Sequence, residues 1–194
     1  MSALDHVVPE FERCDLLRQI DLDRFKASGI PTMALVEGKL GLGRCLKKAR
    51  VVLDSSGRRF EFERFSRFHT DADAAFIVLA LDRDGEPADL VAWRAEPSGF
   101  LALWLGQVGL LGEENLDGAR FGEPLTVHPD PMSWLRCGRE GVVVVDAIRA
   151  GPLLRQTGEM VVDSHRERNR LNAIMRVDLP KIIVRSHIRV VAAE

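Results

Sequence analysis

Apolar runs alternate with polar segments along this 194-residue chain. Toward its end, three runs resemble buried strands separated by two short helical segments: GVVVVD (141–146), EMVVDS (159–164) and KIIVRSHIRVV (181–191). This alternation is typical of strand–helix–strand units in a parallel sheet, which bind ligands beyond the carboxyl ends of their strands. The sequence therefore predicts a βαβαβ-like C-terminal portion, with Asp146 and the 163–166 segment at those ends.

The central part of the chain predicts two β-hairpins. In RVVLDSSGRRFEFERFSRF (50–68), a turn at 54–57 precedes Phe60 and Phe62, which alternate with charged residues. In AAFIVLALDRDGEPADLVAW (74–93), two apolar runs flank a turn rich in aspartate and glycine. Short strands and turns continue to residue 128, so we expect an antiparallel meander from about 50 to 128.

Helices are predicted at the N-terminus and before residue 142. Pro9 suits a first helical position, Asp21 suits the cap of a second helix, and Gly29 suits its end. The segment from Asp130 to Gly138 has a cap, an early proline and a terminal glycine. The expected class is α+β, as a single domain over 1–194 or as two lobes, 1–128 and 129–194.

Composition favours a cytoplasmic protein without a membrane segment. Hydrophobic residues make up 46% of the chain and charged residues 29%, and no export signal is recognised. The longest apolar run, 99–112, is shorter than the roughly 20 residues that cross a bilayer. Cys14, Cys45 and Cys137 are spaced unlike a disulfide framework or a zinc site, so we expect reduced thiols.

Charge is unevenly distributed, although the net charge is only −2. Residues 39–67 carry nine Lys or Arg against three Asp or Glu, whereas 71–130 carry three against twelve. Such asymmetry either attracts an anionic partner or lets the two segments pair within the fold. Arginines interleaved with Phe60 and Phe62 also fit a stacking platform for nucleic acid, against which the neighbouring glutamates argue.

A second basic feature lies at the start of the predicted helix after Asp163. Cations there oppose the positive end of the helix dipole, and a bound anion would explain their presence. Glu167 offers Arg170 an ordinary partner within the helix, which is the alternative explanation. The candidate anion-binding residues are Ser164, His165, Arg166, Arg168 and Arg170.

The sequence ALDRDG (80–85), with VEGK (36–39) upstream, resembles the glutamate and Asp-x-Asp motifs of Toprim domains. That resemblance implies Glu37 as an acid–base residue, with Asp82 and Asp84 holding Mg²⁺. Between the two motifs this chain has a charged hairpin, whereas Toprim domains have a strand–helix unit. The resemblance covers only these two short motifs. The alternative is that both aspartates only form a turn.

A further resemblance concerns LVAW (90–93), WLG (104–106) and PMSWLRCGREGVVVVD (131–146). These segments are similar to an uncharacterised family of bacterial hypothetical proteins, which implies a bacterial cytoplasmic setting and no particular activity. The leading hypothesis is a non-catalytic binding or accessory protein without a cofactor, which contacts an anion or nucleic acid. The alternative is a Mg²⁺-dependent enzyme acting on nucleic acid or phosphate esters.

Overall fold

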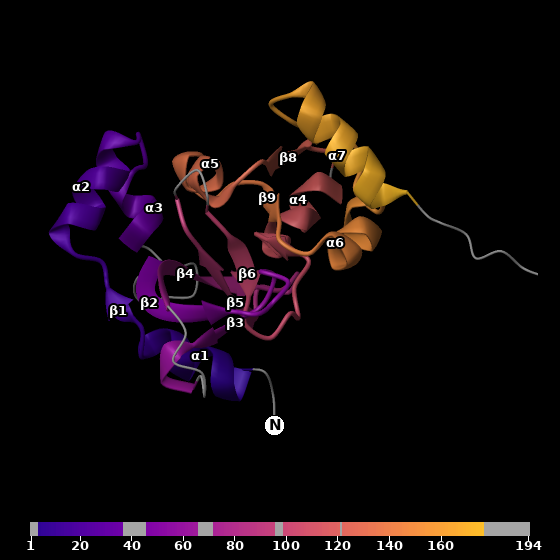
Figure 1. Cartoon of the computed structure of the whole chain (residues 1–194). Helices are drawn as coiled ribbons and strands as arrows, with labels where there is room; N and C mark the ends of the chain where they lie inside the picture. The colour runs from indigo at the N-terminus through magenta and orange to yellow at the C-terminus, as the bar shows by residue number, and fades with distance from the viewer. Residues whose placement is uncertain (1–3, 37–45, 66–71, 96–98, 121, 177–194) are drawn as a thin grey trace, which may run out of the picture.

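The computed structural model describes residues 4–36, 46–65, 72–95, 99–120 and 122–176. Their helices and strands form an antiparallel sheet and a mixed sheet, which confirms the predicted α+β class (Figure 1). Among these residues, no helix combines the length and the apolar character that crossing a membrane requires.

The first sheet contains both predicted hairpins. Its order is β1-β2-β4-β5-β6, all neighbours are antiparallel, and β3 also pairs with β2. The strands are β1 (Asp15–Leu16), β2 (Leu46–Leu53), β3 (Phe60–Phe62), β4 (Asp73–Leu81), β5 (Pro87–Trp93) and β6 (Leu101–Leu103). The meander is therefore confirmed as far as β6.

Alternation of side chains explains the face that β3 buries. Phe60 and Phe62 are 2% and 1% exposed, whereas Glu61 between them faces solvent. The preceding turn closes through Gly57, whose φ of +67° favours glycine. A short 3₁₀ segment, η1 (Glu63–Phe65), follows the strand. Because both rings lie in the core, they cannot stack on nucleic-acid bases.

Three helices precede the sheet: α1 (Leu4–Glu12), α2 (Gln19–Ala27) and α3 (Thr32–Val36). Two details of the sequence prediction were wrong. Pro9 lies inside α1 instead of starting it, and Arg18, not Asp21, is the residue before α2. Asp21 lies in the first turn, where its carboxylate accepts a hydrogen bond from the Arg18 N–H at 3.0 Å. Gly29, with φ +77°, follows the end of α2 as predicted.

The second sheet has the order β10-β8-β9-β7. β8 is parallel to both of its neighbours, and β7 is antiparallel to β9. The strands are β7 (Leu110–Leu111), β8 (Leu125–His128), β9 (Val142–Val144) and β10 (Met160–Val161). The helical segments are η2 (Glu113–Asn115), α4 (Leu116–Arg120), α5 (Pro131–Arg136), α6 (Ala147–Leu154) and α7 (His165–Met175).

The antiparallel meander is shorter than the sequence predicted. Residues 110–128 were expected in the meander, but β7 and β8 belong to the mixed sheet. The βαβαβ portion is present as β8-α5-β9-α6-β10, one strand earlier than predicted. The expected strand at 181–191 lies outside the described residues. β10 is only partly buried, unlike β9, and pairs with β8 instead of β9.

Three apolar clusters hold these layers together. One lies between the antiparallel sheet and the helices α2, α3 and α5, and it reaches Val143 of β9. A second lies on the opposite face of the same sheet, which α1 covers (Figure 1). The third joins the mixed sheet to α6 and α7. The first cluster thus fixes the end of β9 against the antiparallel sheet, where the candidate site lies.

Candidate functional site: a basic cleft at the carboxyl end of β9

A cleft of about 710 Å³ lies between the antiparallel sheet and the carboxyl end of β9. Its lining comes from the turn before β3, from β6, from the β9–α6 junction and from α7. Its charged residues are Asp54, Arg58, Arg59, Asp146 and Arg170. Asp146, which was predicted to lie at the carboxyl end of a strand, follows β9 and lines this cleft. The basic segment 39–67 contributes Arg58 and Arg59 to the same space.

The carboxylate of Asp54 stabilises the turn in which it lies. Its Oδ1 accepts hydrogen bonds from the N–H groups of Ser56, Arg58 and Arg59 at 3.2, 3.1 and 3.2 Å. Desolvation acts to raise the pKa of Asp54, but hydrogen bonds from the Ser56 side chain and these N–H groups outweigh it and lower the pKa. The carboxylate therefore stays ionised and orders the backbone that carries the two arginines.

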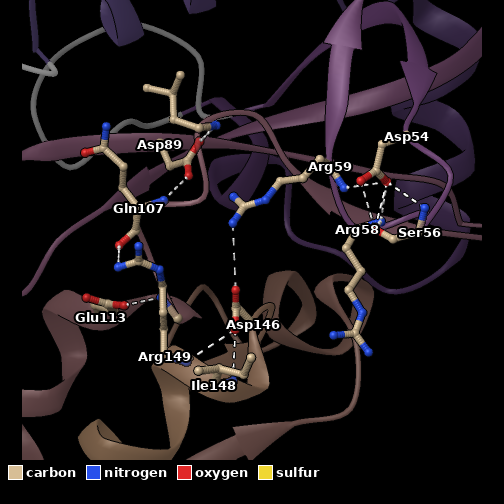
Figure 2. A network of polar contacts seen from close by, with 12 residues as sticks. Asp54, Ser56, Arg58, Arg59, Asp89, Gln107, Glu113, Asp146, Ile148 and Arg149 are labelled. Carbon is tan, nitrogen blue, oxygen red and sulfur yellow. Dashed lines mark hydrogen bonds and ion pairs between the residues drawn. The ribbon is translucent and has the colours of Figure 1, made fainter.

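The Arg58 guanidinium has no partner in the part of the chain that the structure describes. It is exposed, lines the cleft, and makes no hydrogen bond or ion pair with any described residue. In Figure 2 its side chain extends away from the Asp54 turn, and no dashed contact reaches its guanidinium. Arg58 thus offers a full positive charge and its N–H donors to the cleft.

Arg59 reaches across the cleft toward the start of α6. Its Nη2 lies 4.0 Å from Asp146 Oδ2, at the outer limit of an ion pair (Figure 2). Its Nη1 is buried and has no hydrogen-bond partner among the described residues. Arg59 is therefore only weakly neutralised, because one carboxylate oxygen is distant and one donor is unsatisfied.

Gly106 makes room for this guanidinium. A Cβ built on Gly106 would lie 1.2 Å from Arg59 Nη1, and the φ of +72° also favours glycine. The guanidinium therefore lies directly against the backbone of this loop. Any side chain at position 106 would displace Arg59 from the position that it occupies.

The Gly106 loop is held by a buried carboxylate. Asp89 is 0% exposed, and its oxygens accept hydrogen bonds from Leu90 N–H at 2.7 Å, Leu105 N–H at 2.8 Å and Gln107 N–H at 2.7 Å. Burial raises the pKa of Asp89, although these backbone donors act in the opposite direction. Asp89 thus fixes the loop against which Arg59 packs.

A second buried carboxylate positions the other wall. Glu113 Oε1 accepts hydrogen bonds from Gly109 N–H at 2.7 Å and Leu110 N–H at 3.1 Å, and burial raises the pKa of Glu113. The carbonyl oxygen of Gly109 in turn accepts from the N–H groups of Val145 and Asp146, both at 3.0 Å. Glu113 and Gly109 therefore set where α6 begins.

Asp146 serves chiefly as the cap of α6. Its Oδ1 accepts from Ile148 N–H at 2.9 Å and from Arg149 N–H at 3.2 Å. Aspartate is one of the residue types that commonly cap helices in this way. Because the Oδ1 atoms of both cleft carboxylates bind backbone N–H groups, neither carboxylate directly balances Arg58. The cleft can therefore hold an anion by charge and by N–H donation.

Of the residues predicted to bind an anion at the start of α7, Arg170 alone is part of this cleft's lining. Ser164 caps α7, with its hydroxyl oxygen accepting from Glu167 N–H at 3.2 Å. His165, Arg166 and Arg168 are exposed. Arg170 lines the cleft and also bonds Glu167 at 3.2 Å, the intrahelical partner that the sequence offered. The structure therefore brings Arg170 together with Arg58 and Arg59, but not with Ser164.

Asp82 and Asp84, two residues of the Toprim resemblance, are not part of the cleft lining. Asp82 Oδ1 accepts from the N–H groups of Asp84 and Glu86, both at 2.9 Å, so Asp82 orders the β4–β5 turn. Glu37 lies outside the described residues. Among the residues described, no group of three or more His, Cys, Asp or Glu is placed to hold a metal ion. The Mg²⁺ hypothesis stays a prediction.

Comparison of the chain with protein-family models, with curated proteins and with solved structures finds no match.

Sequence reasoning missed three residues that build the site: Asp89, Gly106 and Glu113. Asp89 had a visible signal, because it is the one acidic residue in the otherwise apolar run PADLVAW. A carboxylate inside such a strand requires buried donors. Gly106 and Glu113 had no comparable signal, since their roles depend on contacts with Arg59 and with Gly109.

Proposed function

We propose that this chain is a non-catalytic cytoplasmic binding protein that holds a small anionic ligand in the basic cleft. The observation that carries the proposal is Arg58, which lines a 710 Å³ cleft and whose guanidinium is unpartnered among the described residues. Clefts of this size accommodate small organic ligands. Arg59 adds a second cation, held within reach by Gly106 and Asp89.

In this proposal the protein binds the ligand and does not catalyse a reaction on it. The cleft carboxylates cap a turn and a helix through their Oδ1 atoms, which leaves them poorly placed as a general base. The bacterial family resemblance and the Mg²⁺-dependent alternative remain predictions without a supporting contact.

We expect Arg58→Gln to weaken binding of inorganic phosphate or butyl phosphate at least tenfold. A charge-assisted hydrogen bond contributes about 1.5–3 kcal/mol, and tenfold corresponds to about 1.4 kcal/mol. The measurement is isothermal titration calorimetry at low salt, where such contacts are strongest.

Arg168→Gln is the matched control. It removes the same charge from an exposed position at the start of α7, outside the cleft lining. Wild-type affinity is expected for this variant. The proposal fails if neither anion binds the wild type, or if Arg168→Gln abolishes binding while Arg58→Gln leaves it unchanged.

A further inference from the structure

We propose that the ligand of the cleft is a single-chain anionic amphiphile, such as a fatty acid or an alkyl phosphate. Its head would bind Arg58 and Arg59, and its apolar chain would pass Leu101 into a neighbouring hollow. The inference rests on the proposed function, because both use the same arginines.

The neighbouring hollow has a volume of about 540 Å³ and adjoins the cleft at Leu101, which lines both. It lies between the facing ends of β5 and β6 and the start of α5. Its apolar lining includes Trp93, Phe100, Pro131 and Met132. An extended ligand in the cleft that passes Leu101 would therefore meet a mainly apolar surface.

Each charged residue of this hollow makes at least one hydrogen bond within the protein. Arg94 Nη1 donates to Asp73 at 2.8 Å, and Arg136 Nε donates to the Ser28 carbonyl oxygen at 3.1 Å. Asp130 Oδ1 accepts from Ser133 N–H at 2.9 Å as the cap of α5. Trp93 Nε1 has no partner among the described residues, but protein atoms cover it. The remaining residues of its lining are apolar.

The basic cleft also has apolar side chains in its lining. Leu101, Leu103, Val144 and Ile174 line the cleft beside the arginines. A purely hydrophilic anion would leave these apolar side chains uncovered and the second hollow unfilled. An anionic head on an apolar chain matches both ends, because burying each methylene group favours binding.

The experiment compares butyl phosphate with octyl phosphate by isothermal titration calorimetry, below the concentration at which octyl phosphate forms micelles. A fully buried methylene group strengthens binding about fourfold, so partial burial of the longer chain predicts at least about a tenfold gain in affinity. Arg58→Gln should weaken binding of both compounds, since both place a phosphate at the same head site.

Met132→Lys tests the path of the chain, because it puts a charge into the second hollow. We expect it to remove the advantage of octyl phosphate and to leave butyl phosphate binding unchanged. Met33→Lys, at a 56% exposed position on α3, is the control that should retain the advantage.

The two proposals fail in different ways. Equal affinities for butyl and octyl phosphate in the wild type, with Arg58→Gln still weakening both, would overturn the amphiphile inference alone. The same holds if Met132→Lys keeps the full octyl advantage. If neither compound binds the wild type, the proposed function itself is overturned.

Discussion

Asp89→Ala is expected to lower the free energy of unfolding by on the order of 3 kcal/mol. The substitution leaves the N–H groups of Leu90, Leu105 and Gln107 without their acceptor in a fully buried place. An unsatisfied buried donor costs about 1–3 kcal/mol, and recovery of the carboxylate's own desolvation offsets part of the total. Urea denaturation measures the change, which is a large fraction of the roughly 5–15 kcal/mol that stabilises a domain.

Asp84→Ala is the control for this prediction. Asp84 is exposed in the β4–β5 turn, and surface substitutions of this kind usually change stability by less than about 0.5 kcal/mol. Comparable losses in the two variants would contradict the role of Asp89.

The pH dependence of stability checks the same carboxylate. Burial raises the pKa of Asp89 above its usual 3.8, so the folded protein binds this proton more readily than the unfolded chain does. The stabilisation that arises from this shift is complete below about pH 3.8 and is lost as the pH rises through the raised folded pKa. Wild type should therefore gain stability relative to Asp89→Asn as the pH falls through that window. A difference independent of pH would contradict the raised pKa.

Gly109→Ala is expected to destabilise the protein by about 2–3 kcal/mol, a typical cost of overpacking a well-packed site. The added Cβ would lie 2.5 Å from Ala150 N and 2.7 Å from Arg149 C, both backbone atoms of α6. Because the helix backbone cannot yield as a flexible side chain can, α6 must move. Asp146 and Val145 would then lose their contacts with the Gly109 carbonyl oxygen. Urea denaturation and phosphate titration should show losses of both stability and affinity.

Gly118→Ala provides the matched comparison. No atom lies within 4 Å of a Cβ at this position in α4, and alanine favours helix over glycine by about 1 kcal/mol. We expect unchanged or slightly increased stability. A Gly109→Ala protein as stable as Gly118→Ala would contradict the close packing of Gly109 on α6.

Local patterns were sufficient to predict the hairpins and one helix. Phe60 and Phe62 alternate with charged residues, and the chain buries those rings as the alternation indicates. Asp130 caps α5 with Pro131 as its first residue, as the sequence predicted. These features depend on neighbours within a few residues, so sequence spacing contains the necessary information.

Pairing between strands far apart in the sequence could not be predicted from such local patterns. Nothing in the short runs around β8 and β10 specifies that they pair with each other, and their burial arises from α6 and α7. The cleft also depends on contacts between segments that are distant in the sequence. Arg58 and Arg170 belong to two basic segments that lie far apart in the sequence, and only the packing of the chain places both on one cleft.

The most direct test of the central claim is a two-dimensional ¹H–¹⁵N NMR titration of the full chain with butyl phosphate. The account predicts saturable shifts at the backbone and side-chain N–H signals of Arg58 and Arg59 and at Val145–Ala147. Residues 164–168 at the start of α7 should shift little. Saturable shifts confined to Ser164, Arg166 and Arg168, with Arg58 and Arg59 unchanged, would contradict it.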